Sequence, residues 1–113
     1  MSQITTHILD TARGCPAAGV SLALYRLDDE AWSLLAAGET NSDGRVPGLL
    51  DDDLVLEAGT YRMHFATAPY FEGQDLGVFY PWVDVVFKLP KGGDHYHIPL
   101  LLSPFGYSTY RGS

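Results

Sequence analysis

Apolar residues recur at every second position in several short stretches of this chain, and turn-forming residues separate these stretches at intervals of about a dozen residues. Side chains of a β-strand point alternately to opposite faces, so each stretch can bury one face and expose the other. About seven or eight short strands with regular turns predict an all-β sandwich. The alternation is clearest in four stretches: Val20, Leu22 and Leu24; Tyr61, Met63 and Phe65; Val83, Val85 and Phe87; and Ile98, Leu100 and Leu102.

The sequence gives little evidence for helices, and one proline interrupts a predicted strand. Only residues 70–76 could form a turn or two of helix, and Gly73 weakens that segment. Pro99 interrupts a strong strand pattern, and because proline has no N–H to donate, we expect an edge, a bulge or a strand start there. With 46% hydrophobic and 19% charged residues, the whole chain (residues 1–113) is predicted to form a single globular domain.

The charge and the ends of the chain argue against several classes of partner. The formal net charge is −7 and the seven Lys and Arg are scattered, so we expect no nucleic-acid binding and no attraction to an anionic membrane. No stretch approaches the length of a membrane span, and the N-terminus lacks the features of a signal peptide, which predicts a cytoplasmic protein. The single cysteine, Cys15, excludes an intramolecular disulfide and fits a reducing compartment.

Histidines are the first candidates for chemistry. His95 and His97 are two residues apart, so on a strand they project to the same face, and His7 lies at the start of another predicted strand. This spacing allows three interpretations: a hydrogen-bonded pair at a strand edge, acid–base catalysis near neutral pH, or a zinc site with His7 as the third ligand. The spacing alone leaves all three open.

The C-terminal end is the second candidate. Residues 107–113 alternate aromatic and small polar side chains and finish on Arg111, Gly112, Ser113 and the terminal carboxylate, which predicts an ordered tail that contributes to a site. Arg45 follows the turn at residues 41–44, and its planar guanidinium could bind a carbonyl-rich anionic substrate. The sequence has no nucleophile elbow, no phosphate-binding glycine loop and no paired cysteines.

Five ordered blocks of sequence span the chain: THILD with GCPAAGV (6–10 and 14–20), NSDGR (41–45), FYPWVDVVF (79–87), HYHIPLLLSP (95–104) and YRGS (110–113). Together they resemble the transthyretin-like 5-hydroxyisourate hydrolases. The terminal tetrapeptide separates these hydrolases from the transthyretin hormone carriers, which look similar overall but lack that ending.

The resemblance implies a transthyretin-type β-sandwich of two four-stranded sheets with one short helix, assembled as a homotetramer with active sites in a channel between dimers. It implies hydrolysis of 5-hydroxyisourate to 2-oxo-4-hydroxy-4-carboxy-5-ureidoimidazoline in urate degradation, without a cofactor or a metal. By position, the implied catalytic residues are His7, Arg45, His97 and Ser113, and the implied substrate-binding residues are His7, Arg45, Tyr110, Arg111 and Gly112.

Three other functions remain as alternatives at this point. A carrier of small aromatic ligands would use the same channel without turnover. A zinc-dependent hydrolase would use His7, His95 and His97. A plain β-sandwich interaction module would need neither a cavity nor a tetramer, and the fold by itself cannot decide among these, because function belongs to the site.

Overall fold

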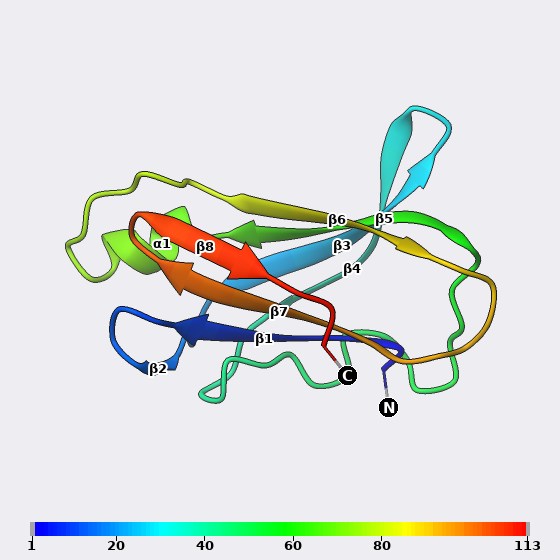
Figure 1. Cartoon of the computed structure of the whole chain (residues 1–113), viewed down its shortest axis with the longest axis horizontal. Helices are drawn as coiled ribbons and strands as arrows, with labels where there is room; N and C mark the ends of the chain where they lie inside the picture. Colours follow the sequence, from blue (N-terminus) through cyan, green and yellow to red (C-terminus); the bar gives the residue numbers. More distant parts are fainter. Residues whose placement is uncertain (1, 113) are drawn as a thin grey trace.

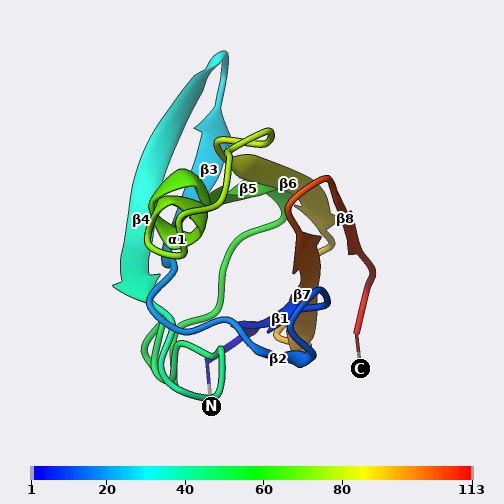
Figure 2. The same cartoon turned by 90° about the vertical axis from the view of Figure 1, so that its left-hand side faces the viewer.

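The computed structural model describes residues 2–112, which form two four-stranded sheets packed against each other (Figures 1 and 2). One sheet has the strand order β2-β1-β7-β8 and the other has the order β4-β3-β5-β6. The elements are β1 (Ile4–Asp10), β2 (Cys15–Pro16), β3 (Ser21–Asp28), β4 (Ala31–Glu39), β5 (Gly59–Ala66), α1 (Ala68–Glu72), β6 (Val83–Leu89), β7 (Tyr96–Ser103) and β8 (Gly106–Thr109). The predicted all-β sandwich of two four-stranded sheets with one short helix is confirmed.

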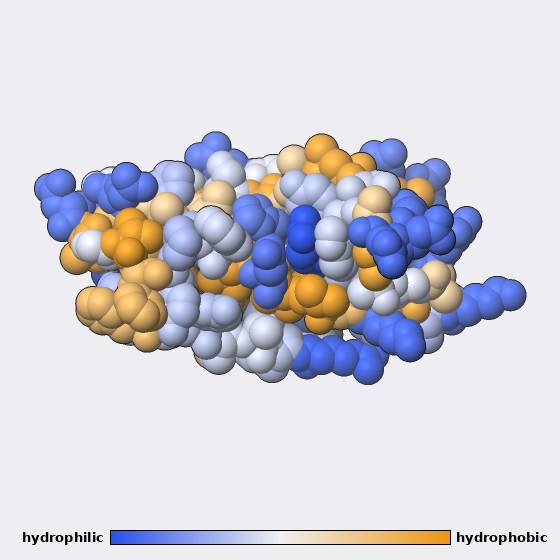
Figure 3. Space-filling view, turned by 90° about the horizontal axis from the view of Figure 1, so that it is seen from above, coloured by the Kyte–Doolittle hydropathy of each residue, from blue (hydrophilic) through white to orange (hydrophobic). Residues whose placement is uncertain are grey.

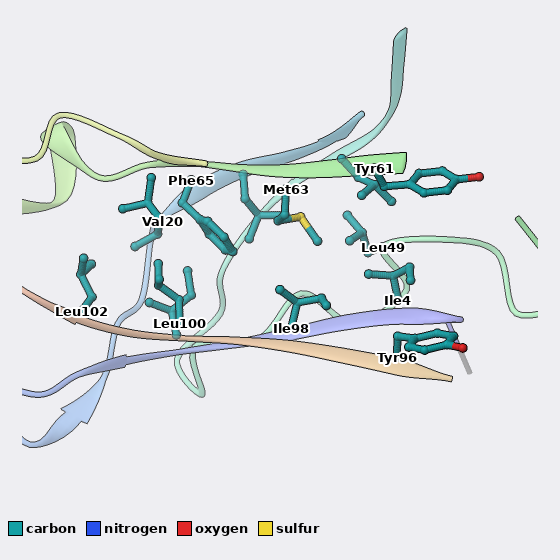
Figure 4. Packing of buried hydrophobic residues seen from close by; sticks show 14 of the residues in the cluster. Ile4, Val20, Leu49, Tyr61, Met63, Phe65, Tyr96, Ile98, Leu100 and Leu102 are labelled. Atoms are coloured by element: carbon teal, nitrogen blue, oxygen red, sulfur yellow. The ribbon is translucent and has the colours of Figure 1, made fainter. Parts of the chain in front are cut away.

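The core lies between the two sheets and is built from the alternating positions that the sequence marks. Met63 and Phe65 of β5 face Ile98 and Leu100 of β7 across the interior, and all four are fully or almost fully buried (Figure 4). Burying a side chain of this size contributes about 1.5–3 kcal/mol, so the pattern fixes which face of each strand points inward. The opposite face of each sheet is left to the solvent or to a partner.

The pairing of β1 with β7 joins the two ends of the chain. These strands run parallel, with Thr5 opposite His97 and His7 opposite Pro99. In β1, burial alternates strictly: Ile4 and Ile8 point into the core, while Thr5 and His7 are half-buried on the outer face. The register therefore places two segments that are about ninety residues apart side by side on one outer surface.

The helix is shifted from its predicted position. It covers Ala68–Glu72, whereas the sequence predicts a helical turn within residues 70–76. Pro69 is compatible with the first turn, where its missing N–H has no partner in any helix. The N–H of Gly73 donates to the carbonyl of Pro69, which closes the last turn. Part of the predicted segment thus lies beyond the end of the helix.

The prediction for Pro99 is wrong. This residue lies in the interior of β7, an inner strand, and its pairing with β1 continues through it without a bulge. The pairing of β7 with β8 is the one that is interrupted. This ladder stops at Leu100 opposite Thr109, and the next bridge joins His97 to Gly112. The missing N–H is thus accommodated by a short gap in the β7–β8 ladder.

No helix within residues 2–112 is long and apolar enough to span a membrane.

Candidate active site

Thr5, His7 and His97 share the outer face of the β2-β1-β7-β8 sheet. Outward positions alternate with core positions along both strands, so the parallel register brings the three side chains together. Histidines from opposite ends of the sequence therefore lie on one surface within a single chain. This arrangement depends on the β1–β7 pairing and on no loop conformation.

A tight turn carries Arg45 to the same face. The side chain of Asn41 accepts hydrogen bonds from the main-chain N–H groups of Asp43 and Arg45, at 2.9 and 3.1 Å. The carbonyl of Gly44 accepts a hydrogen bond of 2.8 Å from the N–H of Ile8, which docks the turn onto β1. His7 and Arg45 then form an antiparallel bridge. The turn predicted from the sequence therefore places Arg45 beside His7.

Gly44 is required at this turn for two reasons. Its φ is +74°, a left-handed conformation that L side chains rarely adopt. In addition, a Cβ at this position would lie 2.4 Å from the main-chain oxygen of Ile8. A larger residue would therefore push the turn, and Arg45 with it, away from β1.

These elements enclose a hollow of about 420 Å³. A guanidinium and imidazoles stand at its wall beside hydroxyl and apolar groups, a combination that suits a flat, oxygen-rich and partly anionic ligand. The residues that line it are Thr5, Thr6, Arg45, Val46, Pro47, His95 and His97.

Burial and neighbouring positive charge perturb the electrostatic environment of His97. Burial lowers its pKa first, and the positive charge of Arg45 lowers it further, with smaller contributions from His95 and His7. A hydrogen bond to the main chain of Thr5 acts in the opposite direction and raises this pKa. The net lowering from the ordinary value keeps the imidazole neutral near pH 7, so it can accept a proton.

His95 lies beside His97, as the two-residue spacing predicts. The two rings are nearly parallel, with centroids 6.5 Å apart. Both contact one hydroxyl: Oγ1 of Thr5 is 2.8 Å from Nε2 of His95 and 2.8 Å from Nδ1 of His97. Within residues 2–112, no three His, Cys, Asp or Glu side chains are grouped so that they could hold a metal ion, and this includes the set with His7.

The C-terminal tail reaches His97 through Gly112. The N–H of Gly112 donates a 2.9 Å hydrogen bond to the carbonyl of His97. A Cβ on Gly112 would lie 2.6 Å from Cδ2 of the imidazole, so only glycine fits against the ring. Ser113, a predicted catalytic residue, lies outside the described residues.

Tyr110 and Arg111 lie along a different hollow, of about 290 Å³, beside β6 and β7. The guanidinium carbon of Arg111 is 4.7 Å from the centre of the Tyr96 ring, a cation–π contact that anchors the tail. In the single subunit, these two predicted substrate-binding residues therefore do not line the hollow that contains the histidines.

Sequence reasoning missed Thr5. His7, two residues away, is a candidate because an imidazole can act as an acid or a base, whereas a threonine in a strand gives no such signal. The alternation in β1 would have placed Thr5 on the face of His7, but only the register with β7 shows that it sits directly opposite His97.

The two-sheet sandwich with a histidine–arginine cluster on its outer face defines a transthyretin-type domain that carries a polar site. A sequence model described as "HIUase/Transthyretin family" matches residues 4–112, and the chain belongs to this family.

Individual relatives agree with this family assignment. The chain is 47% identical to the mouse 5-hydroxyisourate hydrolase, over 99% of this chain and 96% of that protein. It resembles the solved 5-hydroxyisourate hydrolase of Klebsiella pneumoniae with a TM-score of 0.84 and 35% identity, covering 97% of this chain and 98% of the other. The transthyretin of Sparus aurata superposes with a TM-score of 0.91 at 34% identity, covering 99% and 97% of the two chains.

Proposed function

We propose that this protein hydrolyses 5-hydroxyisourate to 2-oxo-4-hydroxy-4-carboxy-5-ureidoimidazoline, a step in urate degradation. The observation that carries the proposal is the hollow in which a neutral His97 stands with Arg45, beside His7. The names of the mouse and Klebsiella relatives support the same reaction. The hydrolase name of a relative that is 47% identical over almost the whole of both chains favours an enzyme over a carrier.

In the proposed mechanism, His97 is the general base. It accepts a proton from a water molecule while the water oxygen bonds to the substrate carbonyl carbon. When the tetrahedral intermediate collapses, the C–N bond of the ring breaks and the imidazolium returns the proton to the leaving nitrogen. The products balance as one carboxylic acid and one N–H from one water molecule. His97 is assigned as the base because it lines the hollow and because burial and the charge of Arg45 lower its pKa.

Arg45 and the tail have supporting roles. The guanidinium of Arg45 binds the substrate oxygens and stabilises the negative charge that develops on the attacked carbonyl. His7, beside Arg45, orients the attacking water. Gly112 fixes the ring of His97, and we place Ser113 next to the substrate as a hydrogen-bonding group. Tyr110 and Arg111 hold the tail, in keeping with the stacking of Arg111 on Tyr96.

We also propose that the protein assembles as a homotetramer and works in the cytoplasm. Exposed apolar residues support self-association: Val86 on β6 and Tyr107 on β8 are 58% and 43% exposed, and both lie on strands at a sheet edge. A further apolar area gathers at the end of the molecule that carries the β7–β8 turn and the loop before β6 (Figure 3), where Phe79 and Phe105 are largely exposed. Large apolar areas of this kind commonly mark subunit interfaces.

The test is the decay of freshly generated 5-hydroxyisourate with and without the protein, after subtraction of the uncatalysed rate. We expect a large acceleration and formation of the ring-opened product. Binding of the substrate without acceleration would favour the carrier. The same assay after dialysis against a chelator separates the proposed metal-free reaction from a zinc-dependent one, because only the latter would lose its rate.

The pH dependence of the reaction follows from the environment of His97. Its lowered pKa means that the neutral base persists below the ordinary histidine value of 6.5, so kcat/KM should stay high at mildly acidic pH and fall only as His97 gains its proton. Replacing Arg45 by glutamine removes one cause of the lowering, so the acidic limb should move to higher pH even though the rate drops. An acidic limb that lies above the ordinary value, or that does not move in the variant, would contradict this assignment.

A further inference from the structure

The hydroxyl of Thr5 lies between two imidazoles. Its Oγ1 is 2.8 Å from Nδ1 of His97 and 2.8 Å from Nε2 of His95. The mechanism above assigns no role to Thr5 or to His95. The contact with His97 follows from the β1–β7 register, which sets Thr5 directly opposite His97, and His95 lies just before β7.

The chemistry of a hydroxyl couples the two rings. A threonine side chain has a single proton to donate and two lone pairs, so it can donate to at most one of the two nitrogens and must accept from at least one. A neutral imidazole has one N–H and one acceptor nitrogen. Three arrangements therefore satisfy both contacts: in the first, His97 donates to Thr5 and Thr5 donates to His95; in the second, both directions are reversed; in the third, both imidazoles donate to Thr5.

The first and third arrangements leave His97 able to act as a base, and only the first also gives the Thr5 proton an acceptor among the contacts of Oγ1 within residues 2–112. When Nδ1 of His97 carries the proton and donates to Thr5, Nε2 keeps a free lone pair. Gly112 lies close to the side chain of His97 on the side of Cδ2, and His97 lines the hollow. In the reversed arrangement, Nε2 carries the proton and cannot accept one from water.

We propose that Thr5 is a positioning residue that holds His97 in its Nδ1–H tautomer, and that His95 directs the Thr5 hydroxyl by accepting its proton. His95 therefore acts through Thr5 and does not touch the reacting atoms. The catalytic part of this inference rests on the proposed function, whereas the tautomer itself is a property of the free protein.

The first test compares Thr5→Val with Thr5→Ser. Valine has a similar shape but no hydroxyl, and serine restores the hydroxyl. Nitrogen NMR of the imidazoles in the substrate-free protein at neutral pH should show the Nδ1–H tautomer of His97 in the parent and in the serine variant, and a shift toward Nε2–H in the valine variant. We expect kcat to fall about tenfold in Thr5→Val, as for the loss of one hydrogen bond in the transition state, with KM little changed and serine close to the parent.

The second test is a double-mutant cycle with His95→Ala. If both residues act through one chain of hydrogen bonds, the losses from Thr5→Val and His95→Ala should not multiply in the double variant. Fully independent losses, or a parent protein whose His97 carries its proton on Nε2, would overturn the proposal. A parent that shows the expected tautomer but no hydrolysis would instead reject the proposed function and leave the positioning role of Thr5 standing.

Discussion

Replacement of His97 by alanine is expected to lower kcat for 5-hydroxyisourate by about a hundredfold to ten-thousandfold, the usual loss when an acid–base histidine is removed. The variant loses the imidazole that lines the hollow and whose pKa is lowered by burial and by the charge of Arg45. The ring is on the outer face, away from the core, so the fold should persist. Stopped-flow absorbance under saturating substrate measures kcat, and circular dichroism checks the fold. His7→Ala and Arg45→Ala should also reduce turnover severely.

His64→Ala is the matched control for this variant. His64 is also a half-exposed strand histidine, and its Nδ1 lies 2.6 Å from Oδ1 of Asp84, but it belongs to the outer face of the other sheet. Its loss should leave kcat within about twofold of the parent, since it neither lines the hollow nor influences the pKa of His97. Equal rates for the parent and His97→Ala would remove His97 from the reaction.

The fold was largely predictable because burial has a simple periodicity in strands. Tyr61, Met63 and Phe65 alternate with Arg62 and His64 in the sequence, and the structure buries the first three and leaves the other two partly exposed. Local sequence predicts the structure around a residue less well where contacts between distant strands determine it. Pro99 predicts an edge, a bulge or a strand start, and nothing in its neighbours reveals that the missing N–H faces a gap in the β7–β8 ladder.

The site was predictable in its residue types more than in its geometry. The sequence indicates histidines, an arginine after a tight turn and the C-terminal residues as candidates, and the structure brings His7, Arg45, His97 and Gly112 together. The exact neighbours depend on a register between strands about ninety residues apart, which no local pattern specifies. That register explains why Thr5 was missed.

Gly112→Ala is expected to lower kcat by about a hundredfold, although the change adds a single methyl group. The added Cβ would lie 2.6 Å from Cδ2 and 3.1 Å from Cβ of His97, so either the imidazole or the tail must move. A displacement of about 1 Å at a catalytic group can cost a factor of this size. The 2.9 Å hydrogen bond from Gly112 to the carbonyl of His97 would be strained by the same movement. Steady-state kinetics on the purified variant measures the loss.

Gly77→Ala supplies the comparison, because a Cβ at that position would meet no atom within 4 Å. The free energy of unfolding of both variants should lie within about 0.5 kcal/mol of the parent value, since neither glycine lies in the core. A loss of activity confined to Gly112→Ala would then come from the contact with His97 and not from a general loss of stability. If deletion of residues 110–113 and Gly112→Ala both leave kcat unchanged, the tail has no part in positioning the base. The orientation of the His97 imidazole must then be held by Thr5 alone.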